Sequence, residues 1–235
     1  MKVILKGDHA KFFKGVWDSL KTLVTEVEMN FSPDKFYLKT IDSMGVCFAY
    51  LEMPKEDFEE YVCEKEEKYC ISTLKMYGAL WRIKGDTIEL NDTAKPGKFT
   101  INGDKKEFNL GLYTIDVKAR DLPDDIKFTT TANVPTKEMK EILDDLIVVN
   151  KDEVILTGVD GKIVFSASDD VSDAGSGSIP YQGEPMNVKL AHVFMRKVLN
   201  MGFDEVKLSC GTNYPAKFDY SKDTKKLFYV IAPRV

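Results

Sequence analysis

The side chains that most often do chemistry are sparse in this sequence and poorly placed for it. The two histidines, His9 and His192, lie in or beside predicted helix faces. The sequence contains no glycine-rich phosphate-binding loop. Cys63 and Cys70 have no second pair of ligands that would complete a zinc site. These residues therefore give no support for catalysis or for a structural zinc ion.

An acidic group in the second half is the remaining candidate for cation binding, and it consists of Asp169, Asp170 and Asp173. A solvated loop explains these carboxylates more simply than a metal site does. We therefore predict no catalytic residue, no metal and no cofactor. A metal-dependent nucleic-acid enzyme is kept as the rival hypothesis from another class, which a hydrolase assay with a divalent metal would test.

Basic side chains gather on predicted helix faces, as contact with a phosphate backbone requires. The predicted helix 11–25 carries lysines opposite its core residues, in a stripe that Asp18 weakens. The predicted helix 189–201 places Lys189 and Arg196 two turns apart on a basic face, with His192 between them. Acidic side chains offset the lysines of the predicted helix 136–148. The candidate phosphate-contacting residues are Lys11, Lys14, Lys21, Lys75, Arg82, Lys84, Lys140, Lys189, Arg196 and Lys197. An ordinary solvated helix face is the alternative for all of them, and it is the preferred interpretation of the helix 136–148.

Composition restricts the class of protein. The chain has 235 residues, of which 43% are hydrophobic, enough for one large or two small domains with real cores. Its apolar runs are too short for a membrane helix, and the first residues lack the apolar core of a signal peptide. Four cysteines in a chain of this length favour a reduced, intracellular setting. The net charge of −5 argues weakly against nucleic-acid binding, so such binding must depend on how the charges are sorted.

Apolar spacing and turn residues predict the elements of the first half. Phe13, Trp17, Leu20 and Val24 have the spacing of an amphipathic helix. The predicted elements are a strand at 1–6, a helix at 11–25, strands around turns at 32–34 and 43–45, a strand at 59–64, a helix at 72–84, and strands at 86–91, 98–101 and 107–113.

The second half repeats this order. Its first helix has Thr136 as the predicted N-cap and Met139, Ile142, Leu143 and Leu146 as its core face. The predicted elements are a strand at 128–134, a helix at 136–148, strands at 154–157 and 163–168 around an Asp160–Gly161 turn, a helix at 189–201, and strands at 206–210, 216–220 and 227–231.

Three segments of each half can be superimposed, which indicates a duplication. Leu38–Asp42 matches Leu156–Asp160 at an offset of 118 (156 − 38), and Asp86–Leu90 matches Asp204–Leu208 at the same offset. Pro96–Phe99 matches Pro215–Phe218 at an offset of 119 (215 − 96). The period is too long for a solenoid. We therefore predict an α+β fold of two tandem domains, each with two helices and antiparallel strands.

The stretch 114–127 is the predicted connector between these domains. It is charged, Pro123 interrupts it, and it has neither helical nor strand periodicity. The predicted boundaries are a first domain at 1–113, the connector at 114–127 and a second domain at 128–235.

Four motifs resemble the sliding clamps of the proliferating cell nuclear antigen type. They are Asn30–Met53 (NFSPDKFYLKTIDSMGVCFAYLEM), Phe58–Lys65 (FEEYVCEK), Lys162–Asp170 (KIVFSASDD) and Leu227–Val235 (LFYVIAPRV). Each motif alone is moderately specific, but their order, the chain length and the connector strengthen the match. Tyr77, Gly78 and Trp81 depart from the pattern, since members of the family often carry lysine there.

The resemblance implies a ring of three subunits with helices around a central hole and sheets on the rim. Such a ring is loaded by a clamp loader, slides on duplex DNA without reading its sequence, and acts as a polymerase processivity factor. It tethers DNA polymerase, flap endonuclease and ligase through short peptide motifs. The implied location is the archaeal cytoplasm or, in a eukaryote, the nucleus, and a homotrimer is expected, with a heterotrimeric or checkpoint-type clamp as the alternative.

The resemblance also implies two sets of contact residues. The subunit interface would pair a strand edge bearing Phe108, Leu110, Leu112 and Tyr113 with an edge bearing Ser178, Ile179 and Tyr181. A flexible loop is the alternative for the second segment. The partner-peptide surface would comprise Ile41, Gly45, Val46, Phe48, Val117, Leu122, Pro123, Phe128, Pro215, Val230, Ile231, Ala232 and Pro233.

Overall fold

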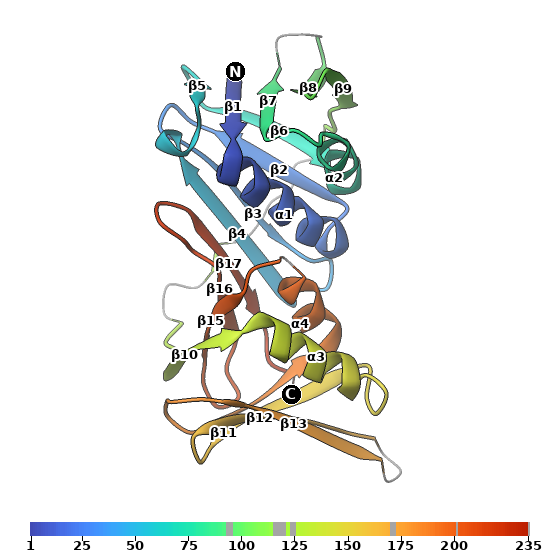
Figure 1. Cartoon of the computed structure of the whole chain (residues 1–235), viewed down its shortest axis with the longest axis vertical. Helices are drawn as coiled ribbons and strands as arrows, with labels where there is room; N and C mark the ends of the chain where they lie inside the picture. The colour runs from blue at the N-terminus through green and yellow to red at the C-terminus, as the bar shows by residue number, and fades with distance from the viewer. Residues whose placement is uncertain (93–95, 115–120, 123–125, 170–172, 201, 235) are drawn as a thin grey trace. The chain divides into compact units, whose positions relative to one another are not determined.

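The computed structural model describes residues 1–92, 96–114, 121–122, 126–169, 173–200 and 202–234 (Figure 1). The chain divides into two compact units. The first comprises Met1–Ser43, Tyr50–Arg120 and Ser221–Leu227, and the second comprises Met44–Ala49, Asp121–Tyr220 and Phe228–Val235. Each unit therefore contains one short segment from the other half of the sequence: Ser221–Leu227 belongs to the first unit and Met44–Ala49 to the second. The simpler boundaries at 1–113, 114–127 and 128–235 stay a prediction.

The first unit contains two helices and two groups of strands. Strands β5, β1, β7, β8 and β9 are neighbours in that order, as are β4, β3, β2 and β6. The elements are β1 (Lys2–Lys6), α1 (Gly7–Leu23), β2 (Glu26–Phe31), β3 (Lys35–Ile41), β4 (Cys47–Pro54), η1 (Lys55–Asp57), β5 (Glu60–Val62), β6 (Glu67–Ser72), α2 (Thr73–Arg82), β7 (Thr87–Asn91), β8 (Lys98–Gly103) and β9 (Lys106–Gly111).

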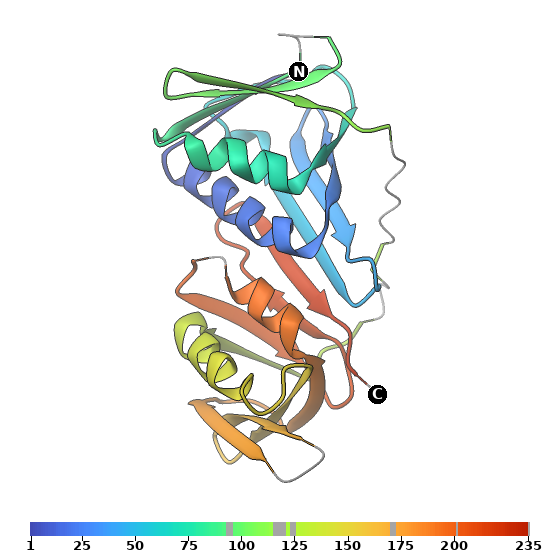
Figure 2. The same ribbon diagram turned by 90° about the vertical axis from the view of Figure 1, so that its right-hand side faces the viewer.

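Helices α1 and α2 lie side by side over the sheets of the first unit (Figure 2). The predicted core residues Phe13, Trp17 and Leu20 of α1 are fully buried, as the helical spacing requires. The helix begins earlier than predicted because Gly7 adopts a positive φ of 58° and donates its N–H to Asp86 O at 2.8 Å. At α2, the Ser72 hydroxyl caps the first turn.

The second unit repeats this plan. Strands β13, β12, β11 and β14 are neighbours in that order, as are β10, β15, β16 and β17. The elements are β10 (Thr130–Pro135), α3 (Thr136–Leu146), β11 (Glu153–Val159), β12 (Lys162–Ser168), β13 (Ala174–Pro180), β14 (Met186–Ala191), α4 (His192–Leu199), β15 (Glu205–Cys210), β16 (Ala216–Asp219) and β17 (Lys226–Ile231). In β17 the first two residues belong to the first unit, and in β4 the first three residues belong to the second unit.

The strand orders confirm a repeated plan but correct the predicted superposition of the halves. Because β4, β3, β2 and β6 correspond to β13, β12, β11 and β14, β3 is equivalent to β12, at an offset of 127 (162 − 35). The predicted match of 38–42 with 156–160 pairs β3 with β11 and is therefore wrong. The second match holds, since β7 and β15 keep the offset of 118 (205 − 87). The offset falls from 127 at β3 to 118 at β7 because η1 and β5, which lie between these strands, have no counterpart among the described residues of the second unit.

Three predicted local features of the second unit are also corrected. Lys189 lies on β14, and α4 begins only at His192. Thr136 is not the N-cap of α3 but its first residue, and the N-cap is Pro135. The Thr136 hydroxyl donates to Phe203 O. The His192 ring is buried, with its nitrogens 3.0 Å from Asn150 O and 2.7 Å from Leu143 O, so it holds the end of α3 and does not join a basic face.

Glycines on β13 allow α3 to pack closely against the sheet. A Cβ at Gly177 would lie 2.8 Å from Cγ2 of Ile142, and one at Gly175 would lie 3.1 Å from Cδ2 of Leu146. These positions are two residues apart and so face the same side of the strand. The segment around Ser178 and Ile179, for which a flexible loop was the alternative, is therefore part of a strand, and the glycines of this strand allow α3 to pack against it.

Two further observations bear on the class of protein. Within the described residues, no helix has the length and apolar content needed to traverse a lipid bilayer. All four cysteines are buried thiols and not disulfide sulfurs.

Candidate functional site

The lysines of α1 are engaged in contacts within the first unit. The Lys14 ammonium donates to Ile83 O at 2.7 Å and to Gly85 O at 3.1 Å, at the end of α2. Burial lowers the pKa of Lys14, and the neighbouring Lys84 charge lowers it further. This lysine therefore ties α1 to the C-terminus of α2, a position where a cation complements the helix dipole.

Lys21 is similarly engaged. Its ammonium lies 2.5 Å from Asp18 Oδ1 and 3.3 Å from the centroid of the Tyr77 ring. Burial alone would lower the pKa of Lys21, but its hydrogen bonds with Asp18 and Tyr77 outweigh burial and raise it. Lys11 is exposed and pairs with Asp8 at 3.2 Å. The α1 stripe thus exists, but carboxylates of the same helix offset two of its charges.

The cations of α2 are the more available ones in the first unit. Lys75, Arg82 and Lys84 are exposed. Arg82 donates to Gly78 O at 3.0 Å, one turn back on the same helix. Among the residues that the structure describes, no carboxylate forms an ion pair with any of these three.

In the second unit, helices α3 and α4 hold their basic side chains in local pairs. Arg196 lies 2.7 Å from Asp144 Oδ1, and Lys140 donates to Asn200 Oδ1 at 2.8 Å. Lys197 lies over the Phe194 ring. Lys189, on β14, lies 3.3 Å from Glu153. The structure therefore brings Lys140, Arg196 and Lys197 to a helix pair but leaves Lys189 outside it.

The segments predicted to join subunits are sheet edges. β9 ends the five-stranded order and β13 ends the order β13-β12-β11-β14. Phe108 and Leu110 on β9, and Leu112 and Tyr113 after it, are all half-buried in the single chain. On the other edge Ser178 is exposed, whereas Ile179 and Tyr181 are buried inside their own unit. The side chains of Ile179 and Tyr181 therefore stabilise the fold of the second unit.

Most of the predicted partner-peptide residues belong to the second unit. There the chain end lies along the segment before β4, with Ala232 N donating to Val46 O at 2.8 Å. Val46, Leu122, Phe128, Pro215, Ala232 and Pro233 are half-buried and Gly45 is exposed. Phe48, Val230 and Ile231 are buried and form the core beneath this strip. Ile41 belongs to the first unit, and Val117 and Pro123 lie outside the described residues.

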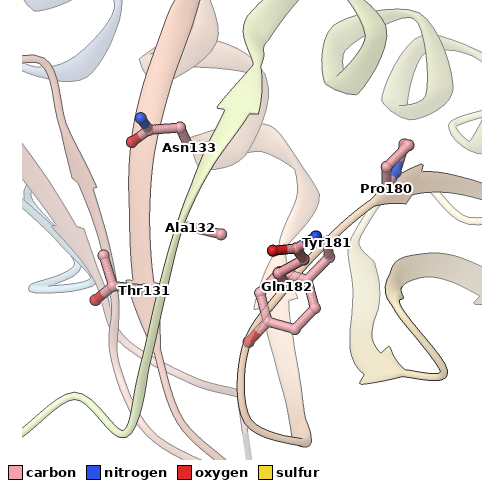
Figure 3. Close-up of a pocket in the computed structure, with 6 residues that line it drawn as sticks. All are labelled: Thr131, Ala132, Asn133, Pro180, Tyr181 and Gln182. Atoms are coloured by element: carbon pink, nitrogen blue, oxygen red, sulfur yellow. The ribbon is translucent and has the colours of Figure 1, made fainter.

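Sequence reasoning missed two features of these surfaces. Met44 is 70% exposed beside the predicted peptide residues, although the turn signal at 43–45 gave its position. A pocket of about 480 Å³ lies between β10 and the end of β13 with the two residues that follow it (Figure 3). Its lining residues are Thr131, Ala132, Asn133, Pro180, Tyr181 and Gln182.

Tyr181 stabilises one wall of this pocket. Its hydroxyl is hydrogen-bonded to Thr130 and donates to Glu184 O at 2.9 Å, and burial raises the pKa of that hydroxyl. A tyrosine held neutral in this way is a structural hydrogen-bonding group. Within the described chain, no group of three or more histidine, cysteine, aspartate or glutamate residues has the geometry to hold a metal ion.

Comparison with known proteins identifies the family. A family model described as the proliferating cell nuclear antigen (PCNA) N-terminal domain matches residues 4–125, more than half of the chain. The DNA polymerase sliding clamp of Methanobrevibacter smithii is 24% identical, with 96% of this chain and 95% of the relative covered. DNA polymerase sliding clamp 2 of Sulfolobus acidocaldarius is 25% identical, with 94% of this chain and 95% of the relative covered.

Solved structures agree on the fold. PCNA from Entamoeba histolytica has a TM-score of 0.89 at 16% identity, with 100% of this chain and 98% of that chain covered. PCNA from A. fulgidus, solved with the C-terminal region of FEN-1 bound, has a TM-score of 0.84 at 18% identity, with coverage of 100% and 98%. A PCNA2–PCNA3 complex from Sulfolobus tokodaii has a TM-score of 0.84 at 21% identity, with coverage of 100% and 99%. With the family model matched and the fold shared over the full length, the chain belongs to the proliferating cell nuclear antigen family of DNA polymerase sliding clamps.

Proposed function

We propose that copies of this chain close into a three-membered ring that encircles duplex DNA and serves as a polymerase processivity factor. The observation that carries this proposal is the likeness to solved clamps over the whole chain, together with the family match. The ring holds DNA polymerase, flap endonuclease and ligase near their substrate through short peptides, and a clamp loader opens it. It catalyses no reaction of its own and works inside the cell, in the cytoplasm if the source is archaeal.

Ring closure uses the two edges β9 and β13. A head-to-tail ring needs two different complementary surfaces on every subunit, and these edges belong to different sheets. Pairing them across subunits would cover the half-buried apolar side chains of β9 and remove two exposed edges that would otherwise favour aggregation.

The DNA contact is sequence-independent and depends on the helices. Contacts to phosphate position a protein without reading bases, which is what a sliding ring needs. The exposed cations Lys75, Arg82 and Lys84 on and after α2 support this role most directly. Lys11, Lys14, Lys21, Lys140, Lys189, Arg196 and Lys197 stay predicted contacts, with the internal partners described above.

Partner peptides dock on the strip along the chain end of the second unit. Half-buried Val46 and Ala232, which are joined by a backbone hydrogen bond, offer apolar contacts beside buried Ile231, and half-buried Leu122 stays a predicted contact. A peptide with an aliphatic and an aromatic residue at helical spacing suits such a strip.

The oligomer mass tests the ring directly. Light scattering on the purified chain should give about 80 kDa, three times the chain mass of 26.6 kDa. A particle of that mass should also raise the product length of a polymerase on primed circular DNA. A monomer that becomes a ring only with other clamp chains would replace the homotrimer with the heterotrimeric alternative. Metal-dependent turnover that survives purification would contradict the absence of catalysis.

The peptide strip is tested by the double substitution Leu122→Glu with Ala232→Glu, which adds charges at half-buried positions and leaves buried Ile231 unaltered. We expect at least a tenfold loss of affinity for a fluorescent peptide of that pattern, because burying a carboxylate without a partner is costly. Val148→Glu is the matched control, because Val148 belongs to the same unit and is 86% exposed. Unchanged peptide affinity in the double variant, with the control also unchanged, would remove the strip as the docking surface.

A further inference from the structure

Helix α2 presents an apolar stripe to solvent. Leu74 is 65% exposed and Trp81 is 56% exposed, although most large apolar side chains of the unit are buried. Half-buried Tyr77 lies between them in the sequence, and its ring stacks on Trp81 with centroids 5.8 Å apart and planes inclined by 25°. Positions 74, 77 and 81 fall on one helix face. We call Leu74, Tyr77 and Trp81 the α2 aromatic surface.

Cations surround the α2 aromatic surface. The Lys21 ammonium lies 3.3 Å from the Tyr77 ring centroid, and the Lys84 ammonium lies 4.9 Å from the Trp81 ring centroid. Lys75 is exposed next to Leu74 in the helix. Two carboxylates lie near these cations: Asp18 pairs with Lys21, and Asp104 accepts from the Lys84 backbone N–H while it pairs with Lys106. The rim is therefore basic in a chain whose net charge is −5.

We propose that the α2 aromatic surface binds single-stranded DNA, with unpaired bases stacking on Trp81 and phosphates contacting Lys75 and Lys84. Exposed aromatic rings interleaved with cations are the arrangement by which proteins hold single strands without sequence preference. All these residues belong to the first unit, so the inference does not depend on ring formation, and it gives Lys75 and Lys84 a single-stranded ligand in addition to the duplex phosphates proposed above.

The ligand class follows from the mixture of an apolar face and a basic rim. A duplex keeps its bases stacked inside and offers mainly phosphates to a helix face, which would leave Leu74 and Trp81 without suitable partners. A single strand offers both phosphates and the faces of its bases. The seven residue steps from Leu74 to Trp81 span about 10 Å of helix, the length of about three base steps at 3.4 Å each. The surface is thus long enough for more than one nucleotide.

The two tryptophans of the chain provide a direct measurement. Trp17 is fully buried, so added oligothymidylate can reach only Trp81. We expect oligothymidylate to quench the intrinsic tryptophan fluorescence and to protect Trp81 from acrylamide, and a hairpin duplex of equal charge to do neither. No quenching by the single strand, or equal quenching by the hairpin, would overturn the proposal.

Substitution separates stacking from charge. By anisotropy of a labelled oligothymidylate, Trp81→Ala should weaken binding about tenfold, and Trp81→Phe should restore most of it. Lys84→Ala should weaken binding and reduce its salt dependence. Val62→Ala, at an exposed apolar residue of the same unit, is the control and should bind as the unaltered chain does.

Other occupants of this face would give different results. If Trp81→Ala lowered the oligomer mass, the face would be a subunit contact, and the proposal would fail. If Trp81→Ala left single-strand affinity unchanged with the oligomer intact, the proposal would fail while the ring function stood. Failure of ring formation in the unaltered chain, with quenching preserved, would instead refute the ring function alone.

Discussion

Single residues near the predicted functional surfaces often serve the fold as well. Lys14 and Lys21 lie on the face expected to approach DNA, yet one bonds to carbonyls at the end of α2 and the other lies on Tyr77 beside Asp18. Helical spacing can place a lysine on a face, but it cannot reveal an acceptor that another element brings near. This is why the sequence predicted the stripe of α1 and not its engagement.

Glu52 gives a residue-scale prediction about pH. Its carboxylate accepts from Lys35 at 2.5 Å, Tyr50 at 2.7 Å and Lys226 at 2.7 Å. Burial alone would raise the pKa of Glu52, but these hydrogen bonds outweigh burial and lower it to about 2. Because this value is below that of the unfolded chain, the stabilisation is complete above about pH 5 and is lost as the pH falls toward 2.

The measurement compares urea unfolding of the unaltered chain and of Glu52→Gln between pH 3 and pH 6. The difference in unfolding free energy should shrink as the pH falls, by at most about 3 kcal/mol over the full titration. Glu56→Gln, at an exposed carboxylate, is the control and should show no such trend. A Glu52→Gln difference that stays constant with pH would contradict the assignment.

Gly78 supports a second residue-scale prediction. It lies inside α2, where glycine costs about 1 kcal/mol relative to alanine, and a Cβ there would meet only the flexible Arg82 guanidinium at 3.7 Å. Gly78→Ala should therefore raise the free energy of unfolding by about 0.5–1 kcal/mol. Denaturant midpoints at unchanged slope would measure this. A loss of stability would mean that α2 needs the glycine for a reason its surroundings do not reveal.

At the scale of elements, the packing of α3 on β13 depends on a missing side chain. Gly177→Ala would place a Cβ 2.8 Å from Ile142 Cγ2, so we expect a loss of about 1–3 kcal/mol of stability. Adding Ile142→Ala should recover part of that loss, because the two substitutions share one contact. Ser178→Ala, on the exposed face of the same strand, should be nearly neutral. Equal destabilisation by the two strand substitutions would contradict this packing.

The elements that the sequence predicted best are those whose apolar residues lie on one face or whose ends are marked by turn residues. The buried face of α1 and the Asp160–Gly161 hairpin, where both residues have positive φ, follow from periodicity and turn chemistry. β6 was missed because a charged run precedes its short apolar part. β14 was missed, and the helix was predicted to begin inside it at residue 189, because the apolar positions of Met186–Ala191 run on into the apolar pattern of the next residues. Tertiary pairing with β11 decides where β14 ends, and a single sequence does not contain that pairing.

The two-domain plan was predictable because the match of Asp86–Leu90 with Asp204–Leu208, which pairs β7 with β15, survives in the sequence even though the match of 38–42 with 156–160 was wrong. The site residues were less predictable, since the register of β13 decides which side chains are buried: Ile179 is buried whereas its neighbour Ser178 is exposed. Sequence alone located the edge itself. Its register, and so the exposure of each side chain, required the structure.

Ring closure gives the prediction that belongs to the whole molecule. Leu110 is half-buried on β9, the edge strand of its sheet, and should become buried when another subunit pairs there. Leu110→Arg should therefore convert the particle of about 80 kDa to the 26.6 kDa chain in light scattering, with an unchanged circular dichroism spectrum. Val62→Arg makes the same kind of change on β5, the opposite edge of the same sheet, and should leave the oligomer intact. If Leu110→Arg kept the larger mass, or if both variants dissociated alike, β9 would not be the edge that closes the ring.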